Sequence, residues 1–201
     1  SALAASLQPG QWGELNTNGF NKGAFLETGS FGKSILQFSD SATWDSNRRR
    51  LLFLGGPHYE PQKFVMYDDS TNTWTAGPLP NSSATLHAYD HNTMDPATGD
   101  LYHRWAGFQA NPFEVYKYSQ ADAKWTKLPD IPAAWQCCGA LEYFPEMNGL
   151  IFVNGGDASV YFYNKSTNQW SKLKSGLSLG PYSNVIEYNP VHKLILFGGG
   201  N

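Results

Sequence analysis

A phrase that recurs three times limits most strongly what this chain can fold into. The three copies are Tyr67-x6-Trp74, Tyr118-x6-Trp125 and Tyr163-x6-Trp170, and their tyrosines are 51 and then 45 residues apart. Self-similarity at such a period indicates one supersecondary unit that is used several times along the chain. The repeat therefore predicts the architecture before any local propensity does, but it says much less about function.

An apolar run that ends near a glycine pair precedes each copy of the phrase. These runs lie at residues 51–56, 101–107 and 150–156, and a fourth lies at residues 194–199. A strand that is apolar at nearly every position is typical of one covered on both faces. The glycine pairs are Gly55 with Gly56 and Gly155 with Gly156. We expect them where backbones crowd together or where φ must be positive.

Alternation and turn chemistry predict four strands in each repeat. The expected strands lie at about 34–44, 50–55, 63–68 and 73–76, then 85–90, 100–106, 114–119 and 124–127, then 139–144, 149–154, 159–164 and 169–172, and finally 183–188 and 193–198. Residues 11–15 match the fourth strands, so an isolated fourth strand is expected there. Each repeated tyrosine ends a third strand and each tryptophan opens a fourth, which allows the two rings to pack across the hairpin.

The apolar run, Gly-Gly, Tyr and Trp at a spacing of about fifty residues resemble the kelch repeat. The resemblance covers residues 11–201 and implies an all-β fold, a β-propeller of four-stranded kelch-like blades. Residues 1–10 are then an N-terminal segment or linker, and 11–201 a single domain. About 3.75 blades are present, so we expect an incomplete propeller whose open edge is covered by later residues or by another subunit.

Composition narrows the choice of partners. The formal net charge is −3 and charged residues make up 15%, which gives no basic face for nucleic acid. No run of about 18 apolar residues predicts a membrane span. Residues 1–6 resemble the small-residue end of a secretory signal peptide, so an extracytoplasmic or secreted location is expected.

The resemblance to kelch propellers implies that ligands bind at the loops after the second strand and before the first. The candidate ligand-binding residues in those loops are His58, Tyr59, Phe108, Trp135, Gln136, Asp157 and Tyr182, and Arg104 on a second strand is a further candidate. Aromatic side chains beside polar ones suit a glycan or a peptide.

The second repeat departs from its siblings at Arg104. From the sequence, this residue aligns with Phe53, Val153 and Leu196. Two readings stay open: an ion pair with a carboxylate such as that of Glu142, or a polar group aimed at a ligand in the central channel.

The only cysteines, Cys137 and Cys138, are adjacent. We expect both to be buried and inert thiols, and the alternative is a vicinal disulfide or a reactive pair near the mouth of the propeller. Five histidines form no short ligand motif, so neither a metal nor a cofactor is expected. A copper-radical oxidase similar to galactose oxidase also uses kelch blades, but its ligand set has no residue-by-residue match in this chain.

The function that these observations favour is a non-catalytic, kelch-type interaction module that binds a protein or a glycan through one face. One alternative is part of a propeller enzyme whose catalytic residues lie outside this chain. Another is a structural subunit whose open propeller edge is completed by a second chain, and self-association would be expected of it.

Overall fold

The computed structural model describes residues 2–29, 33–57, 60–80, 87–105, 114–133 and 138–200. Within these ranges the chain is almost entirely β-structure, with two short α-helices, α1 (Ala2–Ser6) and α2 (Lys22–Phe25), and one 3-10 turn, η1 (Pro145–Met147). No helix in the described part of the chain is long and apolar enough to cross a membrane.

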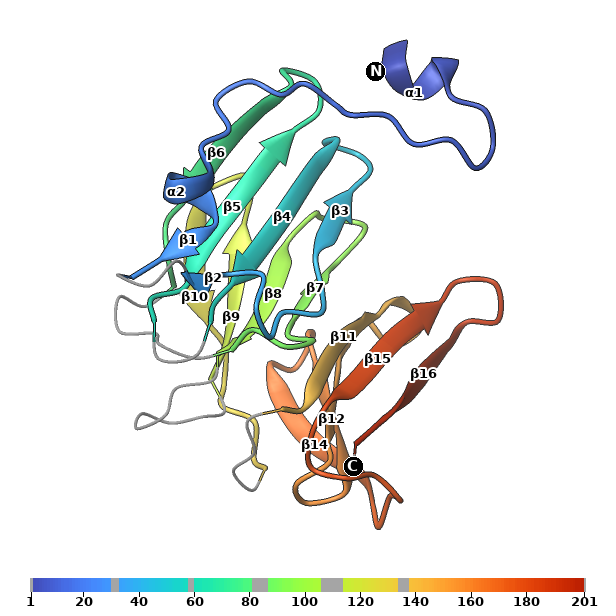
Figure 1. Ribbon diagram of the computed structural model, residues 1–201. Coiled ribbons are helices and arrows are strands. Elements are labelled where there is room, and N and C mark those ends of the chain that lie inside the picture. The colour runs from blue at the N-terminus through green and yellow to red at the C-terminus, as the bar shows by residue number, and fades with distance from the viewer. Residues whose placement is uncertain are drawn as a thin grey trace.

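Three four-stranded antiparallel sheets follow one another along the chain (Figure 1). The first sheet contains β3 (Thr43–Asp45), β4 (Arg50–Gly55), β5 (Lys63–Asp68) and β6 (Thr73–Gly77). The second contains β7 (Asn92–Met94), β8 (Leu101–Trp105), β9 (Glu114–Ser119) and β10 (Lys124–Lys127). The third contains β11 (Ala140–Phe144), β12 (Gly149–Asn154), β13 (Ser159–Asn164) and β14 (Gln169–Ser175).

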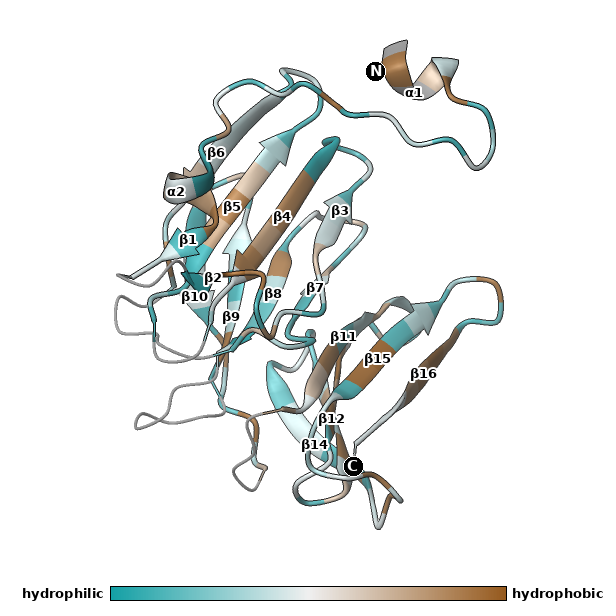
Figure 2. Ribbon diagram, viewed as in Figure 1, coloured by the Kyte–Doolittle hydropathy of each residue, from teal (hydrophilic) through white to brown (hydrophobic). Residues whose placement is uncertain are grey.

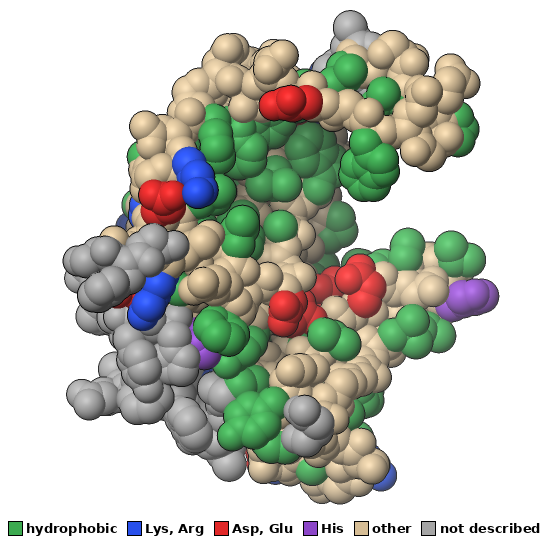
Figure 3. Space-filling view, viewed as in Figure 1, with side chains coloured by type: hydrophobic (Ala, Val, Ile, Leu, Met, Phe, Trp, Pro, Cys, Tyr) green, Lys and Arg blue, Asp and Glu red, His purple; other side chains and the backbone are tan. Residues whose placement is uncertain are grey.

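Two smaller sheets complete the described strands. β15 (Asn184–Asn189) and β16 (Leu194–Gly199) form a hairpin after the third sheet, and β1 (Glu27–Thr28) pairs with β2 (Lys33–Ser34) ahead of the first. The first strands β3, β7, β11 and β15 contact one another in that order, so the sheets share an inner line of strands. The described strands do not close into a ring, because an opening separates β3 from β15 and β16 (Figures 1 and 3).

The hydrophobic core lies between consecutive sheets. Leu52 and Phe64 of the first sheet pack with Leu101 of the second, and Val153 of the third packs with Ile186 of β15. The largest cluster joins the second and third sheets. The prediction that the second strands are covered on both faces is confirmed for β4, β8 and β12, and the hydropathy colouring of β4 in Figure 2 reflects it.

The repeated tyrosines and tryptophans pack as expected. Each Tyr is the direct cross-strand partner of its Trp. The ring centroids lie 5.0 Å, 5.1 Å and 5.3 Å apart in the three copies. The indole Nε1 of Trp125 donates to the carbonyl of Pro78 at 2.7 Å, and that of Trp170 donates to Pro129 at 2.8 Å. Each of these two indoles therefore also holds the segment that leads out of the preceding sheet.

The glycines Gly55 and Gly155 sit where backbones crowd. A Cβ on Gly55 would collide with the carbonyl oxygen of Ile35, and one on Gly155 would collide with that of Gly180. Neither glycine has a left-handed φ, so close approach, rather than conformational freedom, explains these two positions.

Three expected strands are wrong. Residues 34–44 hold only the last residue of β2 and the start of β3, and a turn at residues 35–38 places Ile35 against Phe53 and Val65 of the first sheet. The first strand of the second sheet is β7, not residues 85–90. Residues 11–15 form no strand, and Trp12 is 96% exposed, because they lie beside no strand edge of the described sheets. In each case a local pattern indicated a strand, but the segment lacks the ladder of cross-strand partners that a strand needs, and Ser39 and Tyr89 form only an isolated bridge.

Candidate functional site

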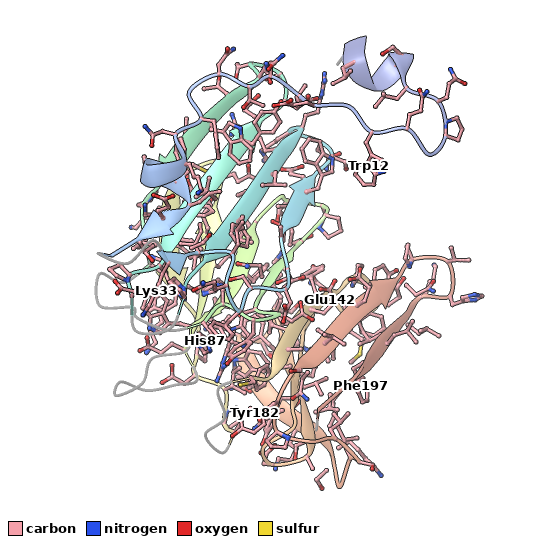
Figure 4. The ribbon with its side chains drawn as sticks, viewed as in Figure 1. Trp12, Lys33, His87, Glu142, Tyr182 and Phe197 are labelled. Carbon is pink, nitrogen blue, oxygen red and sulfur yellow. The ribbon has the colours of Figure 1, made fainter. Side chains whose placement is uncertain are left out.

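The loops predicted to bind ligand gather at one end of the sheets. Because neighbouring strands are antiparallel, the start of each first strand lies beside the end of the second: Asn92 pairs with His103, and Asn184 pairs with Gly199. We call this the loop end. Figure 4 shows Lys33, His87 and Tyr182 along it.

Of the eight candidate residues, three are described. His58, Tyr59, Phe108, Trp135 and Gln136 lie outside the described residues. Arg104 is the second-last residue of β8, Asp157 follows the end of β12, and Tyr182 precedes the start of β15. All three therefore lie at the loop end. The structure thus brings residues from three consecutive sheets to one end of the molecule.

The strand registers show which residues occupy the position of Arg104 in the other sheets, and they revise the alignment made from the sequence. It lies three residues beyond Leu101, the cross-strand partner of a repeated tyrosine. The same count gives Leu54 in the first sheet and Val153 in the third. In the third sheet Leu150 also pairs with Tyr143 of the first strand, and in the β15–β16 hairpin Ile195 pairs with Tyr188 in the same way. Three residues beyond Ile195 lies Gly198. Val153 was aligned correctly, whereas Phe53 and Leu196 were wrong.

Arg104 is fully buried, but it does not pair with Glu142. Its guanidinium lies over the ring of Phe152 at 5.4 Å, and its Nη1 is 3.2 Å from Nε2 of His91. Burial lowers the pKa of Arg104 to about 9, so the group stays charged at neutral pH. The Glu142 carboxyl group instead accepts a hydrogen bond of 2.9 Å from the hydroxyl of Thr93, so the reading that pairs Arg104 with Glu142 is wrong.

Buried histidines extend from Arg104 toward the surface. The rings of His91 and His103 lie 6.3 Å apart, and Tyr89 links His91 to His87 with centroid distances of 5.7 Å and 4.7 Å. Burial, followed by the charge of Arg104, lowers the pKa of His91 and lowers that of His103 to about 3. Both rings are therefore neutral at physiological pH. No group of three or more potential ligands in the described residues could hold a metal ion.

Phe38 lies at the outer end of this row of rings and was missed by sequence reasoning. Its ring is 50% exposed and stacks on His87, with centroids 4.1 Å apart and an interplanar angle of 29°. It was missed because residues 34–44 read as a strand, in which Phe38 would be an ordinary apolar position. No sequence signal marks it apart from a bulky apolar residue in a segment rich in polar ones.

The two other described candidates differ in what surrounds them. Tyr182 is 55% exposed and close enough to Tyr89 to interact with it electrostatically. Asp157 accepts a hydrogen bond from the hydroxyl of Tyr161 and lies 3.8 Å from the ammonium of Lys172. The carboxylate of Asp157 thus bonds within its own sheet, whereas the ring of Tyr182 faces solvent.

Carboxylates line the inner strands. The Asp90 carboxylate accepts the backbone N–H of Ile186 at 2.7 Å, and the Asp90 carbonyl accepts that of Leu141 at 2.9 Å. This residue therefore joins the second sheet to both the third sheet and β15. Burial raises the pKa of Asp90 to about 6 and that of Glu142 to about 8. A cavity of about 400 Å³ beside Asp90 is also lined by Asp40 and Glu187.

The adjacent cysteines differ from the expectation. Cys138 is buried, as predicted, but it is disulfide-bonded and not a thiol. The chain contains one other cysteine, Cys137, which lies outside the described residues. The expectation of an inert thiol is therefore wrong for Cys138.

No protein-family model and no curated protein matches this sequence. Similar solved structures include two auxiliary nutrient binding proteins. That from Bacteroides ovatus has a TM-score of 0.62 and 12% identity over 86% of this chain, and that from Bacteroides thetaiotaomicron has 0.59 and 12% over 85%. TolB from Acinetobacter baumannii gives 0.54 and 16% over 79%. This chain spans 39%, 38% and 37% of those chains, respectively. At such identities the similarity shows the fold alone.

Proposed function

We propose that this chain is part of a kelch-type β-propeller that binds a ligand, without catalysis, at its loop end. The observation that carries the proposal is the row of aromatic and polar side chains there, which runs from Phe38 through His87 and Tyr89 toward Tyr182 and Arg104. Sites that combine aromatic rings with a few polar groups are typical of ligand binding. The two structural neighbours that are called nutrient binding proteins support a binding role.

An extracytoplasmic or secreted location fits this proposal. The disulfide bond of Cys138 supports it, because disulfides persist mainly in oxidising compartments. A nutrient or glycan ligand would also be met outside the cytoplasm.

Replacing Tyr182 should weaken ligand binding while leaving the fold intact. Tyr182→Ala removes an exposed ring that packs little, so we expect a loss of affinity of about tenfold, typical of an aromatic contact residue. Isothermal titration with panels of oligosaccharides and short peptides would measure it. Val191→Ala is the matched control, because Val191 is 80% exposed at the opposite end of the sheets. Equal losses in both variants, or none in either, would count against the loop end as the binding face.

A second role is favoured by the free edge of β16. In the described chain β16 pairs only with β15, and Leu194 and Leu196 are exposed on the face toward the opening. The second strands of the three complete sheets have a third strand at this position. We propose that β16 is covered in the native assembly, either by further polypeptide or by another subunit.

The isolated chain of 201 residues should therefore self-associate in sedimentation velocity as its concentration rises. Leu196→Lys should reduce this association, since it places a charge on the uncovered face. Leu173→Lys is the control, because Leu173 is equally apolar and exposed but lies on β14. A monomer at every concentration would show that this edge needs no cover.

A further inference from the structure

We propose that a small cavity between the inner strands binds the trimethylammonium head of a small soluble cation. The cavity has a volume of about 180 Å³ and lies at the end of the sheets opposite the loop end. The first strands of four sheets contribute to it, through Trp44 of β3, Met94 of β7, Glu142 of β11 and Tyr188 of β15. This inference goes beyond the binding function proposed for the loop end and does not depend on it.

Aromatic rings form the walls of this cavity. Trp44 is 50% exposed although it lies on an inner strand, and the rings of Tyr143 and Tyr188 line the same space. The hydroxyl of Tyr188 donates to Glu146 at 2.8 Å. That of Tyr143 donates to Asn148 at 2.9 Å, so both hydroxyls are already bonded and the rings are held in place. The faces of Trp and Tyr rings attract cations, and the recognition of quaternary ammonium ligands uses this attraction.

A carboxyl group completes the cavity. Figure 4 shows Glu142 beside the inner strands, between the first sheet and the β15–β16 hairpin. Its Oε2 accepts the hydroxyl of Thr93, and among the described residues its other oxygen has no hydrogen-bond partner. Burial, followed by the nearby carboxylates of Glu187 and Asp90, raises the pKa of Glu142 to about 8. A bound cation would supply the positive charge that these carboxyl groups lack.

The cations of the protein around this cavity are already paired. Arg48 lies 3.0 Å from Asp45, and Lys165 lies 2.6 Å from Asp95. Glu142 has no such ion pair in the described part of the chain. The surroundings of the cavity are therefore negative in balance, which disfavours an anionic ligand and favours a cationic one.

The size and the walls of the cavity indicate which cation fits. The volume lies below the roughly 300–1,000 Å³ of sites for drug-sized ligands, so only a small head group is accommodated. Within the described residues no group of side chains could hold a metal ion. A primary ammonium has three N–H donors, and one free carboxyl oxygen between aromatic walls cannot satisfy them all. A trimethylammonium group has no N–H to satisfy and gains from every ring face.

Choline is the probe that tests the site, titrated by calorimetry into the 201-residue chain while NMR spectra follow the indole N–H of Trp44. We expect choline to bind and to shift this signal. The uncharged alcohol in which carbon replaces the choline nitrogen has the same shape and should bind at least about tenfold more weakly, as should ethanolamine. Trp44→Ala should lose about tenfold or more in affinity, whereas Trp44→Phe keeps a ring face and should stay within about threefold. Trp12→Ala is the matched control, because Trp12 is 96% exposed in the N-terminal segment.

The affinity for choline should also rise with pH through Glu142. A bound cation favours the ionised carboxyl group, so the pKa of Glu142 in the complex should fall below its value of about 8 in the free protein. Between pH 6 and pH 8 the affinity should therefore increase by about tenfold. Glu142→Gln should abolish this increase, and because Asp90 and Glu187 are present in both proteins, the difference between them reports on Glu142.

The remaining outcomes would overturn the inference. Equal binding of choline and its uncharged counterpart would remove the role of charge, and full affinity in Trp44→Ala would remove the aromatic wall. Amide shifts confined to the loop end would place choline there instead. Binding of phosphatidylcholine vesicles without binding of free choline, or binding of neither, would exclude a small soluble ligand. None of these results bears on the loop end, whose test is Tyr182→Ala.

Discussion

Raising the pH from 5 to 8 should destabilise the protein by about 2–3 kcal/mol relative to a Glu142→Gln variant. Burial, with a further contribution from Glu187 and Asp90, raises the pKa of Glu142 from 4.5 to about 8. Between these values the folded protein keeps a proton that the unfolded chain has lost, so stability falls as the pH rises. A tenfold difference in proton affinity between the folded and unfolded states is worth about 1.4 kcal/mol. We take less than the full value because Glu142 is not completely buried.

Glu142→Gln should remove this contribution and raise stability at pH 8 relative to the wild type, since the amide keeps a hydrogen-bond acceptor for Thr93 but never ionises. Urea unfolding at pH 5, 6.5 and 8 would measure the effect. Glu14→Gln is the control, because Glu14 is exposed in the N-terminal segment. His91 and His103, whose pKa values are lowered by burial, add stability as the pH rises in both proteins, so the difference between the two proteins reports on Glu142. A difference that does not grow from pH 5 to pH 8 would show that Glu142 is ionised in the folded protein.

Trp170→Ala should destabilise the protein by about 3 kcal/mol, at the lower end of the range for buried Trp, because the indole is only partly buried. The ring packs against the largest core cluster, and its Nε1 bonds to Pro129 between the second and third sheets. Trp125→Ala should cost a similar amount for the same reasons. Chemical denaturation would measure both.

Trp74, the first of the three repeated tryptophans, should contribute less to stability than the other two. The sequence alone predicts equal losses for the three, since they occupy the same slot and full burial was expected. The indole of Trp74, however, donates to the hydroxyl of Thr17 in the N-terminal segment and holds no segment between two sheets. Trp74→Ala should therefore cost about 1 kcal/mol less, because its hydrogen bond holds an end segment of the chain rather than a link between two sheets. Losses at Trp74 as large as those at Trp170 would contradict this reading.

The parts of the fold that the sequence predicted correctly are those set by short-range pattern. The second to fourth strands, the Tyr–Trp pairs and the crowded glycines Gly55 and Gly155 each follow from residues close together in one repeat. The first strand of each sheet was harder to predict from the sequence. β7 is only three residues long, and it is stabilised by contacts such as Asn92 to Ser41 and Leu54, which lie 51 and 38 residues away. Spacing within one repeat contains no information about such partners.

The candidate site divides in the same way into features that a short-range pattern predicts and features that depend on distant partners. Tyr182 was predicted because it stands in a loop before a first strand, and Arg104 because it breaks an apolar pattern. The partner of Arg104 was wrong, because the side to which Glu142 points depends on how the sheets pack. The place of Phe38 in the row of rings was missed because it depends on a left-handed backbone and a stacked histidine, and both appear only in three dimensions.

The most direct test of the loop end as the binding face is an NMR titration of the ¹⁵N-labelled chain. The probes are neutral hexasaccharides of glucose, xylose and mannose, each added separately. The largest amide shifts are expected at residues 38–41, 87–91 and 182–184, which come from three different sheets or their leading segments. The contrary result is a largest response at the opposite end, in the turns at residues 95–99, 145–148 and 189–193, or no response to any of the three sugars.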